Sequence, residues 1–163
     1  MSDRDEVDEI IAGWDGVRPG LDTQPMQVWS RIARLAQVQD DARSRAFAQQ
    51  GLALWEFDVL AALRRAGHPY RLTPSQLTAD THVTSGTMTN RIQRLSDKGL
   101  VKRLAHPDDG RGALVELTLA GLAAADEALT RLVDAERELS VALDDQQCHQ
   151  LAGLLRALLL SVG

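Results

Sequence analysis

The chain has 163 residues, of which 44% are hydrophobic, 25% charged and 4% aromatic, and its formal net charge is −5. This composition is typical of one ordinary globular domain, and it excludes a disordered tail or a mini-protein held together by disulfides. Because Cys148 is the single cysteine, an intrachain disulfide is excluded, which favours a reducing compartment.

Charge is distributed unevenly along the chain. Residues 64–111 contain nine basic and four acidic side chains, a balance of +5. Residues 1–22 contain two basic and seven acidic side chains, and residues 112–163 contain three and eight, so each end carries −5. Since a net charge averages over all faces of a protein, the acidic total is compatible with one basic surface.

Several classes of protein are not expected. The acidic residues 1–6 do not fit a signal peptide, and no apolar run approaches the roughly 18 residues of a membrane span, so we expect a cytoplasmic protein without a membrane partner. The four histidines and Cys148 lack the spacing of a metal site, so no metal is expected. No catalytic motif is present, so we expect neither an enzyme nor a cofactor.

Three helices are predicted in the first part of the chain. Apolar residues at helical spacing indicate helices over residues 5–15, from Met26 to about Gln50, and over residues 52–66. A capping box at Thr73 then starts a short helix.

A second cap follows a turn and starts a helix over residues 85–98. Met88, Ile92 and Leu95 lie within about 60° of each other on this helix, and the opposite face is polar. The helix is therefore predicted to bury one narrow stripe and to expose a broad polar surface.

The rest of the chain predicts a hairpin and two more helices. Residues 100–104 and 113–117 are typical of short strands, and the turn between them is rich in Gly, Asp and Pro. Thr118 caps a helix to about Leu139, and Asp144 or Asp145 begins the last one.

This order of elements predicts a winged helix-turn-helix, mainly α with a small β-hairpin wing. We expect one compact domain overall. Residues 1–50 would supply N-terminal helices for dimerisation and part of a ligand site, residues 52–117 the winged region, and residues 118–163 the C-terminal dimerisation helices.

A short polar helix beside a basic hairpin fits the major groove of double-stranded DNA. A polar helix face is often merely solvated, but the turn, the charge block and the hairpin together favour DNA binding. Arg111 lies at the tip of the hairpin, where it can reach the minor groove. The predicted DNA-contacting residues are Ser85, Thr87, Thr89, Asn90, Gln93, Arg94 and Arg111.

Four segments of the chain resemble the MarR family of bacterial transcriptional regulators: Thr84–Leu95, Lys98–Arg103, Pro107–Arg111 and Leu114–Thr118. The resemblance implies an obligate homodimer, most often a repressor, whose two winged domains bind a pseudo-palindromic operator. Asp109 and Arg111 match the family's Asp-x-Arg wing motif. Gly110 stands where many members have a second Arg, which predicts one phosphate contact fewer.

Part of the chain also resembles the urate-responsive, PecS-like members of this family. Trp14, Asp58, Arg91 and Arg103 stand in matching contexts, which implies a small aromatic anion such as urate as the effector. The two arginines would bind the anion through forked hydrogen bonds, while Trp14 would stack on it. Asp58 would pair with an arginine in the empty protein and repel the anion, which gives a switch.

Other interpretations stay open. Trp14 also fits a packing role, Arg91 and Arg103 fit phosphate contacts, and Asp58 fits an ordinary ion pair. The effector could instead be a phenol or an oxidant acting at Cys148, and the fold could serve as an interaction dimer without DNA. The absence of Asp and Glu from residues 84–94 counts against that last alternative. The operator, the regulated genes, the direction of regulation and the ligand's identity are left open by the sequence.

Overall fold

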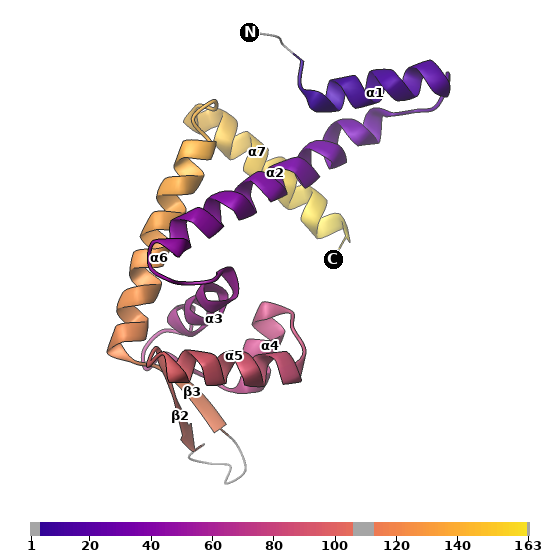
Figure 1. Ribbon diagram of the computed structural model, residues 1–163. Helices are drawn as coiled ribbons and strands as arrows, with labels where there is room; N and C mark the ends of the chain where they lie inside the picture. Colours follow the sequence, from indigo (N-terminus) through magenta and orange to yellow (C-terminus); the bar gives the residue numbers. More distant parts are fainter. Residues whose placement is uncertain (1–3, 106–112, 163) are drawn as a thin grey trace. The chain divides into compact units, whose positions relative to one another are not determined.

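A computed structural model describes residues 4–105 and 113–162 (Figure 1). The described residues form two compact units, Met1–Ala42 and Arg43–Gly163, and the boundary falls inside the second helix. The elements are α1 (Glu6–Val17), α2 (Gln24–Ala48), α3 (Leu54–Arg65), β1 (Arg71–Leu72), α4 (Pro74–Thr81), α5 (Ser85–Asp97), β2 (Val101–Ala105), β3 (Ala113–Leu117), α6 (Leu119–Leu139) and α7 (Asp145–Val162).

The predicted fold class is confirmed, because seven helices and a small antiparallel sheet make up the described residues. Most predicted helix ends lie within about two residues of the observed ones, which is the usual uncertainty of a helix boundary. Within these residues, no helix combines the length and the apolar character that crossing a membrane requires.

The first unit contains α1 and most of α2. Asp5 caps α1, since its carboxylate accepts hydrogen bonds from the backbone N–H groups of Val7 at 2.8 Å and Asp8 at 3.1 Å. Val7 and Ile11 are the buried residues of α1. The helix therefore has a defined start and one apolar side, as its sequence pattern predicts.

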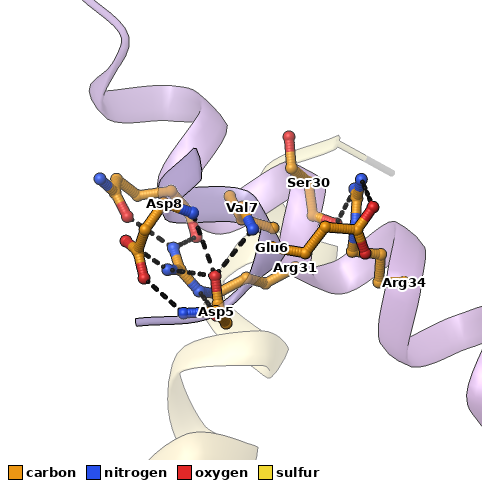
Figure 2. A network of polar contacts seen from close by, with 8 residues as sticks. Asp5, Glu6, Val7, Asp8, Ser30, Arg31 and Arg34 are labelled. Atoms are coloured by element: carbon orange, nitrogen blue, oxygen red, sulfur yellow. Dashed lines mark hydrogen bonds and ion pairs between the residues drawn. The ribbon is translucent and has the colours of Figure 1, made fainter. Parts of the chain in front are cut away.

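Arginines of α2 hold the acidic start of α1 (Figure 2). Arg31 donates to Asp5 at 2.7 Å and to Asp8 at 2.9 Å, and Arg34 donates to both oxygens of Glu6 at 3.1 Å. These hydrogen bonds lower the pKa of Asp5 and Glu6 below their ordinary values. Charge pairing thus adds to apolar packing between the two helices.

The second unit has a continuous apolar core. Phe47, at the end of α2, stacks on Phe57 of α3 with 4.5 Å between ring centroids. Met88, Ile92 and Leu95 of α5 are fully buried in the same core. The narrow apolar stripe predicted for this helix is therefore confirmed, and its polar face is left outside.

The sheet differs from the prediction by one strand. Its order is β1-β3-β2, with both pairings antiparallel, whereas the sequence predicted only the hairpin of β2 and β3. β1 pairs Arg71 with Glu116 and Leu72 with Val115. Because two residues show no alternation, β1 carries no local signal, and only its pairing partner makes it a strand.

The turns around α4 and α5 follow the predicted capping residues. Thr73 and Gln76 form the capping box of α4, and Thr84 caps α5 by accepting from the backbone of Thr87. His82 ends α4 in the left-handed conformation, with φ of 52°. These local features place α5 directly after a tight turn, as a helix-turn-helix requires.

The start of α6 is fixed against the beginning of β2. The hydroxyl of Thr118 donates to the carbonyl of Gly99 at 2.7 Å. A Cβ atom at Gly121 would collide with the backbone carbonyl of Leu100, so only glycine permits this close approach. The winged region is thereby joined rigidly to the helix that leaves it.

Candidate nucleic-acid interface and effector site

The polar face of α5 lies open to solvent, as predicted. All six residues proposed for DNA contact within the described part of the chain are exposed: Ser85, Thr87, Thr89, Asn90, Gln93 and Arg94. The seventh, Arg111, lies outside the described residues. The face is therefore available to a groove-sized partner, and its hydroxyl and amide groups are short enough for close approach.

Local hydrogen bonds orient several of these side chains. The Thr89 hydroxyl donates to the Ser85 carbonyl at 3.0 Å, and Gln93 donates to the Asp97 carboxylate at 2.8 Å. Asp97 is the last residue of α5, so the acidic charge lies at the far end of the face from Ser85. The exposed N-terminal part of the helix is therefore free of acidic side chains, which suits an anionic partner.

Two arginines of α5 share one aromatic ring on α3. The guanidinium carbons of Arg94 and Arg91 lie 5.0 Å and 5.4 Å from the ring centroid of Trp55. Trp55 and Arg91 are half-buried, whereas Arg94 is exposed. Trp55 carries no local signal in the sequence, because its place beside α5 depends on how α3 and α5 pack.

The residue after α5 is anchored to the start of α3. Lys98 donates to the Glu56 carboxylate at 2.8 Å and to the Gly51 carbonyl at 3.1 Å. Glu56 is 1% exposed and also accepts from the backbone N–H of Ala53 at 2.9 Å. This contact holds the C-terminal end of α5, while Thr84 caps its N-terminal end.

The basic residues of the sheet are partly neutralised. Glu116 of β3 pairs with Lys102 at 2.7 Å and with Arg71, and the hydrogen bond from Lys102 is the main cause of its lowered pKa. Arg103 of β2 donates to the Thr89 carbonyl of α5 at 3.3 Å. Glu116 thus offsets part of the positive charge of residues 64–111 at the sheet.

The four residues predicted for the effector fall in different parts of the structure. Trp14 belongs to the first unit, on α1, with 46% of its surface exposed. The other three belong to the second unit, where Arg91 contacts Trp55 and Arg103 contacts α5. Among the described residues, Asp58 has its ion pair with Arg43, at 3.0 Å, and not with Arg91 or Arg103.

Asp58 lies in a cleft of about 330 Å³ in the second unit. This cleft combines cationic, acidic and apolar groups from the end of α2, from α3 and from the end of α4. The lining residues are Arg43, Phe57, Asp58, Ala61, Arg65, Asp80, Thr81 and His82.

Of the residues that line the cleft, Asp58 is the one that the sequence predicted for the effector site. Asp58, Ala61 and Arg65 are spaced by three and four residues on one helix, so Arg65 was within reach of a helical-periodicity argument. Arg43 and His82 come from other elements, and only tertiary packing brings them to Asp58. No group of three or more potential metal ligands occurs in residues 4–105 and 113–162.

Comparison with known proteins agrees with this geometry. The profile of the MarR family matches residues 50–112. The chain is 35% identical to the HTH-type transcriptional regulator PecS of Dickeya dadantii (strain 3937) over 150 residues, which cover 92% of this chain and 90% of PecS.

Solved structures give the same answer. Wild-type MarR from E. coli in its apo form superimposes with a TM-score of 0.71 and 29% identity, over 81% of this chain and 96% of that one. A cysteine-to-serine mutant of MarR from E. coli, complexed with operator DNA, has a TM-score of 0.71 and 27% identity, over 90% of this chain and 97% of that one. The chain therefore belongs to the MarR family.

Proposed function

We propose that the chain is a cytoplasmic, ligand-responsive transcriptional regulator, which binds a pseudo-palindromic operator as a homodimer and is released by a small aromatic anion. The observation that carries the DNA part is the exposed polar face of α5, a helix that buries its opposite stripe and is anchored through Lys98 at its C-terminal end. A helix held in this way can enter a major groove without losing its orientation.

Family membership supports the same function. PecS is named as a transcriptional regulator, and the MarR mutant has been solved with operator DNA. On this chain, Arg94 would contact base edges, while Arg111 of the wing would contact the backbone or the minor groove. The short side chains of Ser85, Thr87 and Thr89 would position the helix on phosphates.

Dimerisation is supported by apolar surface on the last helix. α7 has no buried residue among those described, yet it carries exposed leucines at helical spacing. They are Leu151, Leu154, Leu155 and Leu159. An apolar stripe of this kind is typical of an interface, and a second copy of the chain offers the same stripe.

For the effector, we propose the predicted set of Trp14, Asp58, Arg91 and Arg103. Its support is chemical, since two guanidinium groups, an indole and a repelling carboxylate suit a planar anion. An anion that binds Arg91 would act on α5 directly, because Arg91 is part of that helix. Similarity to PecS over most of the chain favours this assignment.

A second placement of the same effector is favoured by the cleft around Asp58. Arg43 and Arg65 line this cleft and can pair with an anion, which would compete with Asp58 for Arg43. Thr81 and His82 at the end of α4 line it too, immediately before the turn into α5. Occupation of the cleft would therefore act on α5 through that turn.

One set of titrations tests both parts of the proposal. Fluorescence anisotropy of a labelled duplex from the region upstream of its own gene should show selective binding over a scrambled duplex, weakening as salt rises. Arg94→Ala should lower selectivity by about 1–3 kcal/mol, whereas Arg111→Ala should weaken both duplexes similarly. Absence of selective binding by the wild-type dimer would remove the DNA function.

The effector arm uses urate, related purines and salicylate-like phenols. An effective compound should release the duplex and raise the melting temperature of the free protein, since it binds the native state. If Arg91→Ala and Trp14→Phe abolish the rise in melting temperature, the effector binds at the predicted set of four residues. If only Arg65→Ala abolishes it, the effector binds in the cleft around Asp58. Arg137→Ala is the control, because Arg137 is an exposed arginine of α6 that pairs with Asp134. If peroxide releases the duplex from the wild type but not from Cys148→Ser, the signal is oxidation of Cys148 and not binding of an anion.

A further inference from the structure

Trp55 is a half-buried residue of α3 that faces two arginines of α5. The guanidinium carbon of Arg94 lies 5.0 Å from its ring centroid and that of Arg91 lies 5.4 Å away. Both distances fall within the roughly 6 Å over which a cation is attracted to an aromatic face. The indole of Trp55 therefore interacts with the half-buried Arg91 and with the exposed Arg94.

The position of the Arg94 guanidinium over the Trp55 ring matters for base recognition. A guanidinium that lies over an aromatic ring keeps its N–H donors pointing outward in its own plane, so they stay available to a base edge. A free arginine side chain samples many rotamers, and part of this freedom is lost when it binds. Contact with Trp55 restricts Arg94 before DNA arrives, and binding then costs less entropy.

Arg91 shares the Trp55 ring with Arg94. It is half-buried on the same side of α5, one helical turn from Arg94, and it also contacts the ring. The two like charges repel each other, so attraction to the ring has to offset this repulsion. The anchored end of α5 at Lys98 keeps the helix and the ring in register.

We propose that Trp55 is a positioning residue for DNA recognition, which holds the guanidinium of Arg94 in a conformation ready to contact a base. This inference rests on the proposed DNA function. Trp55 itself need not touch DNA, because it acts through Arg94.

The test compares variants at Trp55 in two backgrounds. Operator and scrambled duplexes are titrated by anisotropy with the wild type, Trp55→Leu, Trp55→Phe, Arg94→Ala and the Trp55→Leu/Arg94→Ala double variant. Trp55→Leu should weaken operator binding about two- to tenfold and lower the ratio of operator to scrambled affinity. Trp55→Phe keeps an aromatic face and should recover most of that loss.

The double variant separates positioning from packing. If Trp55 acts through Arg94, Trp55→Leu should lower operator affinity by less than about twofold in the Arg94→Ala background. Leu54→Ala is the matched control, since Leu54 packs against the same core from the neighbouring position of α3 and should leave the affinity ratio unchanged. Melting temperatures measured alongside identify any variant that fails to fold.

A second readout needs no DNA. In a ¹H–¹⁵N spectrum of the free protein, the Arg94 Nε–H resonance should shift in Trp55→Leu, because the ring current is removed, and should shift little in Leu54→Ala. An unchanged resonance, an unchanged operator affinity, or an equal loss in both backgrounds would overturn the inference. If the wild type shows no selective binding, the proposed function itself fails, while selective binding unaffected by Trp55→Leu removes only the role of Trp55.

Discussion

Glu56 is a carboxylate with 1% of its surface exposed, and Lys98 provides its counter-charge at 2.7 Å. Removing water from an ion is costly, so a buried carboxylate is tolerated only when hydrogen bonds and an opposite charge compensate it. Glu56 receives both, since it also accepts the backbone N–H of Ala53. The pair joins α3 to the end of α5, the helix proposed to contact DNA.

We expect Lys98→Met to lower the free energy of unfolding by about 1–3 kcal/mol, because it leaves the Glu56 carboxylate buried without its cation. The double variant Glu56→Gln/Lys98→Met should lose less free energy of unfolding than the sum of the losses in Glu56→Gln and Lys98→Met, since the neutral amide needs no counter-charge. Urea unfolding followed by circular dichroism measures both. Strictly additive losses would show that the two side chains stabilise the protein independently.

At the scale of elements, charge contributes to holding α1 against α2. Arg31 and Arg34 of α2 donate to Asp5 and Glu6, and these hydrogen bonds lower the pKa of both carboxyl groups from their ordinary 3.8 and 4.5. A carboxylate with a lowered folded pKa stabilises the folded state above its unfolded pKa, and the stabilisation disappears as the pH falls through the folded pKa. The attachment of α1 should therefore weaken in acid.

Hydrogen exchange of the α1 amides checks this prediction. After correction for intrinsic rates, protection of α1 should be constant near neutral pH and should fall as the pH drops below about 4.5, the ordinary value for Glu6. Arg31→Met/Arg34→Met should reduce protection already at neutral pH and remove most of its pH dependence. Equal pH dependence in the variant would mean that other groups control α1.

For the whole molecule, charge is divided between acidic segments at the two ends of the sequence and a basic block between them. The acidic segments, residues 1–22 and 112–163, contain all of α1, α6 and α7, whereas the basic block contains α4 and α5. A net charge of −5 therefore coexists with one face suited to DNA. Acidic surroundings would also disfavour DNA approach from other directions.

We expect sedimentation velocity to show a dimer at micromolar concentration. Leu154→Glu/Leu159→Glu should shift the chain toward monomer and weaken operator binding, because two charges would have to be buried in an apolar interface and half-sites would no longer be linked. Gln146→Glu, also on α7, is the control for added charge. A wild-type monomer, or a double variant that stays dimeric, would exclude this interface.

Much of the fold follows from the sequence alone because its signals are short-range. Capping residues such as Thr73 and Thr84, and the stripe of Met88, Ile92 and Leu95, depend on residues within two helical turns. For the same reason the exposed face of α5 was predictable, together with the exposure of the six described residues proposed for DNA contact. The effector residues had no such local signal, so they came from resemblance and stay a prediction.

The sequence by itself determined the order of helices, the buried stripe of α5 and the basic block, since periodicity, capping and charge are written along the chain. Only the tertiary structure decided that Arg71 and Leu72 form a strand, that Trp55 lies beneath Arg91 and Arg94, and that Asp58 pairs with Arg43. Each of these contacts joins elements separated along the chain. Their partners are chosen by packing of the core, which no single segment encodes.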